Sequence, residues 1–273
     1  MSRTDRLSLV AGFAAILCSA AGHCCADDSE LSPEARRDRA AAHASQGRFE
    51  QAIGEMDRLL KLRPDDAEAC QFRGELHFKA GHISASIQDF DRVLELRPER
   101  LPHHWQRGIS YYYAGRYRQG AHQFELHQRV NPQDVENAVW HYLCKAKLEG
   151  VDRARAALIN ITSDRRPWAP IVYRMYQGRA TPEQVLTEAG QAGRMESERR
   201  DSLFYAHLYV GLFHEAAGRS QQAREHIEIA VQKYPSPHYM GDVARIDLQL
   251  RKVNDKALDA LAPAGTAKPG SRQ

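Results

Sequence analysis

The sequence predicts an all-α fold in which helical hairpins stack side by side into a solenoid. One observation is a step of 34 residues that relates positions in the N-terminal half, and another is the lack of the alternating pattern typical of strands. The positions that recur three times at this step are Ala40, Gly74 and Gly108; Gly47, Gly81 and Gly115; Phe49, Ile83 and Tyr117; Met56, Phe90 and Phe124; Leu62, Leu96 and Val130; and Pro64, Pro98 and Pro132. This agreement indicates tandem units of one structure.

The residue types within one unit indicate how each hairpin is built. In the second unit, Gly74 lies where the first helix presses on the second, and Gly81 ends the first helix in a left-handed conformation. Ile83 opens the second helix, Phe90 lies two turns further along its buried stripe, and Pro98 ends it. This period and order are typical of the tetratricopeptide repeat (TPR) class of helical hairpins.

Three regular units and a weaker fourth follow from this pattern. Ser32 as N-cap and Pro33 at the first helical position predict the start of the array. The fourth unit keeps the apolar spacing of a helical hairpin but lacks the closing proline. The predicted units cover residues 33–66, 67–100, 101–134 and 135–160.

The repeat pattern then breaks over an irregular insertion, residues 161–197. Pro167 and Pro170 exclude a continuous helix, and a short apolar helix is expected after them. Thr181-Pro182-Glu183-Gln184 combines an N-cap, a first-turn proline and a capping-box glutamine. It therefore predicts a second short helix over 182–192.

The hairpin spacing returns in a fifth unit, residues 198–235. Gly211, Gly218 and Pro235 are separated by 7 and 17 residues, as are the corresponding residues of the third unit. An amphipathic helix over 238–253 is expected to cap the stack, because the last hairpin would otherwise expose an apolar face.

The two ends of the chain are expected to differ from the solenoid, residues 27–253. Residues 1–26 have a weakly basic start, a short apolar stretch and small residues before Ala26, which predicts a signal peptide cleaved after that residue. The alternative is an uncleaved N-terminal anchor. Cleavage would leave an exported chain, periplasmic or extracellular, without a stable membrane anchor. Residues 254–273 are expected to be a disordered tail because Pro, Gly, Ala, Ser and Lys dominate them.

Composition and motifs argue against catalysis. The net charge is +3, with acidic and basic residues interspersed and no Lys/Arg tract, so no nucleic-acid partner is expected. The sequence has no Gly-x-Ser-x-Gly, His-Glu-x-x-His, P-loop or Cys-x-x-Cys motif. We therefore expect no enzyme activity, no catalytic residues and no cofactor. A hydrolase or metal site hidden on the scaffold is the minor alternative.

Histidines and cysteines do not form a recognisable metal or disulfide pattern. His122 and His127 share one predicted helix, but a separation of five residues is a poor spacing for a common metal ion, so no metal site is expected. Cys70 and Cys144 lie in the second and fourth units, too far apart for a disulfide, and are expected to be small buried helix residues.

The candidate binding surface is the concave wall that the first helices of the hairpins should line. By helical spacing, its residues are Arg37, Gln71, Glu75, Phe78, Trp105, Ile109, Tyr112, Tyr113, Val139 and Leu143. Trp105 and Tyr111–Tyr113 cannot all face one interior, so at least one of Tyr112 and Tyr113 should meet solvent or a ligand. Aromatic anchors often dominate protein interfaces, although packing against the next hairpin is the alternative.

The region after the regular units resembles the NlpI-type periplasmic TPR proteins. The resemblance is carried by Asp164-Arg165-Arg166-Pro167-Trp168, Tyr173-x-x-Tyr176-x-Gly178, Thr181-Pro182-Glu183 and the returning hairpin from Glu198 to Tyr234. It implies an envelope adaptor that binds protein partners and forms a homodimer. The chain has no convincing lipobox, so the membrane anchor of that family is not implied.

The sequence as a whole predicts an exported, non-enzymatic scaffold or adaptor. Its concave groove would bind a protein or peptide partner, and preformed helices would keep the ordering cost of binding low. The alternative is a structural subunit of an envelope assembly that self-associates through the edges of the solenoid.

Overall fold

Helices account for the regular secondary structure in the part of the chain that the structure describes. The computed structural model describes residues 31–193 and 195–261, so the predicted signal peptide lies outside the described residues. The helices, in chain order, are α1 (Pro33–Ser45), α2 (Phe49–Leu62), α3 (Ala67–Ala80), α4 (Ile83–Leu96), the 3-10 helix η1 (Pro98–His103), α5 (Trp105–Tyr113), α6 (Tyr117–His127), α7 (Val135–Glu149), α8 (Val151–Ala156), α9 (Ala169–Tyr176), α10 (Pro182–Gln191), α11 (Glu196–Ala216), α12 (Ser220–Lys233) and α13 (Tyr239–Leu261).

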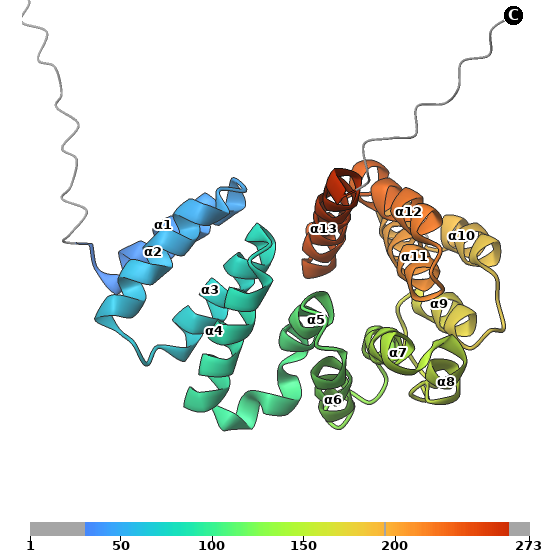
Figure 1. Cartoon of the computed structure of the whole chain (residues 1–273), viewed down its shortest axis with the longest axis horizontal. Helices are drawn as coiled ribbons and strands as arrows, with labels where there is room; N and C mark the ends of the chain where they lie inside the picture. The colour runs from blue at the N-terminus through green and yellow to red at the C-terminus, as the bar shows by residue number, and fades with distance from the viewer. Residues whose placement is uncertain (1–30, 194, 262–273) are drawn as a thin grey trace, which may run out of the picture.

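The helices pack as the repeat predicts. The pairs α1/α2, α3/α4 and α5/α6 form the three regular units, α7/α8 the weaker fourth, and α11/α12 the returning fifth. Figure 1 shows the hairpins following one another along an arc, with α5 and α7 on its inner side and α6 and α8 on its outer side. The Ser32 hydroxyl caps α1 by accepting from the Ala35 amide at 3.2 Å. The all-α solenoid expected from the sequence is confirmed.

Glycines make the close contacts and tight turns that define each hairpin. A Cβ on Gly74 would lie 2.7 Å from the Phe90 ring, and one on Gly108 would lie 2.7 Å from the Phe124 ring. Gly81 and Gly115 end the first helices with φ of +85° and +70°, the left-handed conformation that side chains disfavour. The roles assigned to these residues from the repeat are confirmed.

Alanine substitutions at two helical glycines are expected to have opposite effects. Gly108→Ala should lower the free energy of unfolding by about 1–3 kcal/mol, because its methyl group would be forced against the Phe124 ring. Gly54→Ala should raise it by about 0.5–1 kcal/mol, because nothing lies within 4 Å of the added methyl and alanine favours helix. Urea unfolding of both variants measures the difference. An equal effect at the two sites would contradict the close contact.

The irregular insertion forms part of the packed interior. Thr181 and Gln184 form the predicted capping box at the start of α10, which ends at Gln191. Trp168 is fully buried and stacks on Tyr205 of α11 with ring centroids 4.3 Å apart. The segment around Trp168 therefore joins α9 and α11 as fixed core structure.

The last helix is longer than predicted and has a second packing partner besides the last hairpin. α13 runs to Leu261, whereas the sequence predicts a helix ending at Val253 and a disordered tail. Residues 254–261 contain Ala, Leu, Lys and Asp without a breaker, and the first proline is Pro263, so the helix has no reason to stop earlier. Residues 262–273 of the predicted tail lie outside the described residues. α13 packs on α12, as a cap would, and it also packs on α3 near the other end of the array.

A helix that crosses a bilayer must be both long and apolar. Within the described ranges, no helix combines the length and the apolar character that crossing a bilayer requires.

Candidate functional site

The concave wall is occupied in part by the chain's own C-terminal helix. Figure 1 shows α13 inside the arc, between α3 and α5 on one side and α11 and α12 on the other. The ring of Tyr239, at the start of α13, stacks on Phe78 of α3 with centroids 5.4 Å apart. The same ring meets Trp105 of α5 edge-on at 5.0 Å. The wall therefore binds a helix through aromatic contacts.

Polar contacts fix α13 on both sides. The Asp247 carboxylate, almost fully buried, accepts from the Tyr113 hydroxyl of α5 at 3.2 Å and from Arg251 Nε at 2.5 Å. Arg251 also pairs with Glu215 of α11 at 2.7 Å. Burial raises the pKa of Asp247, although the Arg251 guanidinium opposes this shift. This chain of contacts links the third hairpin, α13 and the fifth hairpin.

Half of the residues predicted to line the groove are core residues. The buried ones are Phe78, Ile109, Tyr112, Val139 and Leu143. The prediction that these side chains project into an open groove is wrong, because they belong to one continuous hydrophobic core shared by α13 and the adjacent hairpins. Single-helix spacing identified the inner face, but it could not show that other helices cover this face.

The other predicted residues remain half-exposed. They are Arg37, Gln71, Glu75, Trp105 and Tyr113. Arg37 pairs with Asp66 at 3.0 Å, and the Gln71 amide donates to Glu75 at 2.8 Å. Burial raises the pKa of Glu75, with the Gln71 hydrogen bond acting against it. No described contact tests whether these side chains bind a partner, so their role stays a prediction.

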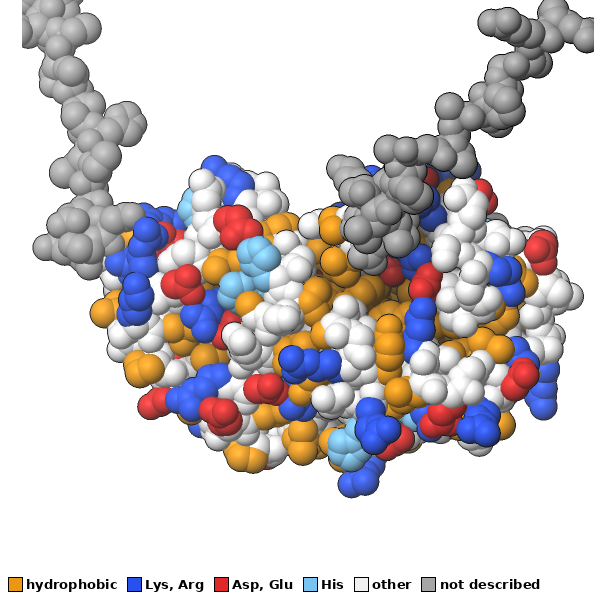
Figure 2. Space-filling model, in the orientation of Figure 1, with side chains coloured by type: hydrophobic (Ala, Val, Ile, Leu, Met, Phe, Trp, Pro, Cys, Tyr) orange, Lys and Arg blue, Asp and Glu red, His pale blue; other side chains and the backbone are white. Residues whose placement is uncertain are grey.

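A cavity of about 240 Å³ opens between α5, α6, α7 and α13. Its apolar wall is formed by Trp105, Phe124, Trp140 and Met240, with the Phe124 and Trp140 rings stacked at 6.4 Å. In Figure 2, hydrophobic side chains gather in the hollow centre of the face, and charged side chains surround them. The cavity is an aromatic recess beside the start of α13.

Two buried polar atoms of this recess have no hydrogen-bond partner. They are the Asn137 Oδ1 atom and the Trp140 Nε1–H group, on residues that are 3% and 1% exposed. The Asn137 Nδ2 group donates to Phe124 O and to Gln128 Oε1, both at 3.1 Å, which fixes the amide orientation. A buried acceptor and a buried donor are therefore free to recognise a ligand.

Carboxylates line the same recess and share one guanidinium. Asp134 and Glu136 line the cavity, and Arg166 binds each of them at 2.5 Å and also Asp164 at 2.5 Å. Glu136 Oε1 accepts from the Tyr209 hydroxyl at 2.5 Å. Burial raises the pKa of Glu136 to about 7, against the opposing effect of Arg166. The cluster is formally negative.

Only part of this recess is predicted by the sequence. Trp105 is among the predicted site residues, whereas Asn137, Trp140 and Glu136 are not. Asn137 and Trp140 are three residues apart, so they share one face of α7. This spacing is the signal in the sequence that could have added them to Trp105 as candidate site residues. The free Asn137 acceptor depends on Gln128, the residue that follows α6, and the sequence alone does not reveal this contact.

The histidines form a contact that the sequence did not predict. His207 and His226 Nδ1 atoms lie 3.1 Å apart, and His214 stacks on His226. Burial lowers the pKa of His207 to about 4 and also lowers the pKa of His226. His214 Nδ1 already accepts from Arg219 at 2.7 Å. No group of three or more metal-ligating side chains suited to an ion occurs among the residues that the structure describes.

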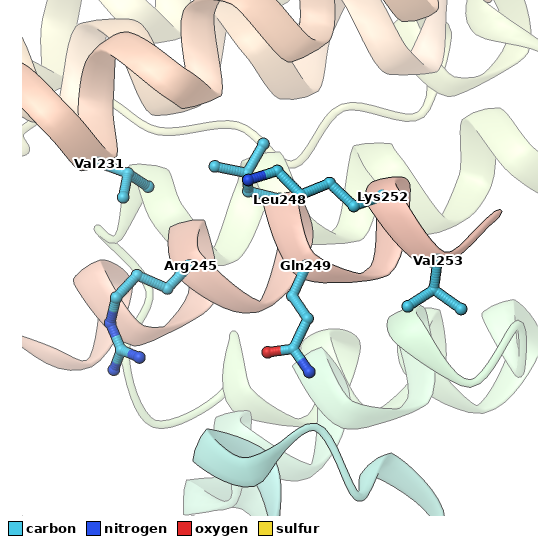
Figure 3. A pocket seen from close by; sticks show the side chains of 6 residues that line it. All are labelled: Val231, Arg245, Leu248, Gln249, Lys252 and Val253. Carbon is cyan, nitrogen blue, oxygen red and sulfur yellow. The ribbon is translucent and has the colours of Figure 1, made fainter. Parts of the chain in front are cut away.

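A more open hollow of about 350 Å³ lies between α12 and α13. Figure 3 shows its lining residues, which are Val231, Arg245, Leu248, Gln249, Lys252 and Val253. None of them has a buried polar atom without a partner. The hollow therefore lacks the directional groups found in the aromatic recess.

Comparisons with known proteins agree with the hairpin architecture. The tetratricopeptide repeat family model matches residues 26–67 and 37–100. The chain is similar in structure to a tetratricopeptide repeat protein from Parabacteroides merdae ATCC 43184, at 14% identity and a TM-score of 0.51, over 81% of this chain and 85% of that one. The fold is the all-α TPR helical-hairpin solenoid, and the matches support a TPR protein.

More distant solved structures were also found. MamA 41-end from Desulfovibrio magneticus RS-1 is 15% identical, with a TM-score of 0.45 over 74% of this chain and 93% of that one. A thermophilic TPR protein of Thermus thermophilus is 16% identical, with a TM-score of 0.43 over 83% of this chain and 100% of that one. No curated protein sequence matches the chain.

Proposed function

We propose that this protein is an exported, non-enzymatic scaffold that binds a protein or peptide partner on its concave wall. The TPR fold supports the scaffold role, and the apolar leader that ends at Ala26 supports export. The resemblance to NlpI-type proteins in the insertion supports an adaptor in the cell envelope and a homodimer.

The single observation that carries the proposal is the aromatic recess beside α13. Rigid helices hold Trp105 and Trp140 in place, and the free Asn137 acceptor and Trp140 donor are already oriented. A partner that docks there meets a preformed surface, so little conformational entropy opposes binding. Because α13 already lies along the same wall, a partner segment would bind next to it or replace part of it.

Site-specific photocrosslinking in intact cells tests the proposal. A benzoylphenylalanine at Gln106, half-buried on α5, should capture a defined partner. The matched control is the same probe at Gln119, exposed on α6 at the outer side of the arc. Crosslinks at position 106 alone support a concave-wall scaffold. Identical adducts at both positions, or none at 106, would contradict it.

Mass spectrometry of the mature chain tests export separately. We expect an N-terminus at Asp27 and recovery in the secreted or periplasmic fraction. The control is Ala26→Arg, which removes the small residue that signal peptidase requires. A wild-type chain that retains residues 1–26 would show that the leader is not cleaved.

A further inference from the structure

We propose that the aromatic recess between α5, α6, α7 and α13 binds the ammonium group of a lysine side chain in an extended partner segment. The inference rests on the proposed function, because it assumes that a partner lies along the concave wall. It goes further by naming the chemistry that the wall recognises.

The first argument is the unsatisfied acceptor. Gln128 donates its own Nε2 group to Pro132 O at 2.8 Å, so its Oε1 atom must face Asn137 and accept from it. Asn137 Oδ1 is then left buried and without a donor from the protein. A buried carbonyl in this state costs free energy that a ligand N–H would recover.

The second argument is charge. The ionisable residues that line the recess are Asp134, Glu136 and His127, and no lysine or arginine lines it. Arg166 neutralises only part of the charge, because it also pairs with Asp164. An incoming cation is therefore attracted, and a carboxylate ligand would be repelled.

The third argument is the shape of the walls. Trp105, Phe124 and Trp140 present aromatic surface to a cation and to the methylene groups that carry it, and Met240 adds apolar contact. The ammonium group has three donors, which match an amide oxygen and carboxylate oxygens. A bare metal ion would gain little from a recess so rich in aromatic side chains.

The fourth argument identifies a peptide as the source of the cation. The Trp140 Nε1–H group is a donor and cannot bind an ammonium group, so it needs an acceptor from the same ligand. A backbone carbonyl close to a lysine supplies that acceptor. A free amine would leave the indole N–H unpaired.

Binding should depend on pH through Glu136. Burial raises the pKa of this carboxyl to about 7, and the groups that face it are Arg166, Asp134, Tyr209 and Tyr205, with His127 lining the same cavity. A bound cation favours the ionised carboxylate and competes with its proton. The affinity should therefore rise from pH 6 to pH 8, by up to about tenfold.

The test follows the indole N–H signals of the ¹⁵N-labelled mature chain by NMR. The protein has three tryptophans, so Trp140→Phe assigns the relevant signal by its loss. The probe is a short capped peptide with one central lysine, and the matched controls carry norleucine or acetyl-lysine there. We expect the lysine peptide to shift the Trp140 signal and to bind about tenfold more tightly than either control.

Two variants separate the cation contact from general binding. Glu136→Gln keeps the shape, and it should lower the affinity for the lysine peptide and remove the pH dependence. Trp105→Ala, at the half-exposed rim, should weaken all three peptides. Circular dichroism and thermal unfolding of each variant, rather than the Trp168 signal, report intact folding, because Trp168 lies against Arg166 and Tyr209, which both contact Glu136.

Two outcomes would overturn the inference. Equal affinities for the lysine and norleucine peptides would show that the recess does not recognise charge. An unmoved Trp140 signal with every peptide would show that the recess binds no such segment. In either case, crosslinks from position 106 would still decide the scaffold role, so the two proposals can fail separately.

Discussion

Replacing Arg166 by methionine should lower the free energy of unfolding by about 2–4 kcal/mol. The guanidinium joins Asp134, Glu136 and Asp164, and it covers the Trp168 ring at 4.7 Å from the centroid. Its loss leaves three carboxylates close together without a counter-charge. Because the Arg166 side chain is 36% exposed, the lower part of the range is the better expectation. Chemical denaturation at neutral pH measures the change.

Two controls make this prediction specific to the cluster. Arg165→Met removes the same charge at an exposed neighbouring position and should change stability by less than about 0.5 kcal/mol. Adding Glu136→Gln to the Arg166 variant should restore part of the loss, since one of the repelling carboxylates is gone. Equal effects of the two single substitutions would contradict the role assigned to Arg166.

Removing α13 should have the largest effect on the molecule. A chain that ends at Pro235 loses the buried side chains of Met240, Val243, Ile246 and Leu248. At about 1.5–3 kcal/mol for each large buried side chain, the loss exceeds about 5 kcal/mol, which is the total stability of many domains. We expect increased binding of a hydrophobic dye and a broadened thermal transition.

The same truncation permits a direct test of helix binding by the wall. A synthetic peptide of residues 237–261 should restore the sharp transition when it is added to the truncated chain. A matched peptide with Tyr239→Ala and Asp247→Arg should fail, because it loses the stack on Phe78 and reverses the charge that meets Tyr113 and Arg251. If both peptides restored the sharp thermal transition equally, the contacts of Tyr239 and Asp247 would not be needed for α13 to bind the wall.

The sequence predicted the features that arise within one hairpin. The small residue at Gly108, the left-handed turn at Gly115 and the capping box at Thr181 each depend on neighbours a few residues away, or on one adjacent helix. Because such residues recur at a fixed spacing, the boundaries of the repeat units could be predicted from the sequence. The same local rules assigned Trp105 and Tyr113 to the inner wall, and these residues contact Tyr239 and Asp247 of α13.

The features that the sequence did not predict arise from contacts between distant segments. α13 reaches across to Phe78 and Tyr113, and no local pattern shows which wall an amphipathic helix will choose. The buried positions Val243, Ala244 and Ile246 form an apolar stripe of ordinary width, which suits either wall equally. The recess was equally hidden, because its charge depends on Arg166, which lies 30 residues from Glu136.

The position of α13 also determines the order in which the molecule is completed during synthesis. The N-terminal hairpins contain mainly local contacts, so they can fold as soon as they leave the ribosome. Phe78 and Trp105 are covered by Tyr239 only after α13 has been synthesised. Until α13 has been synthesised, the growing chain exposes an aromatic surface that is prone to nonspecific association.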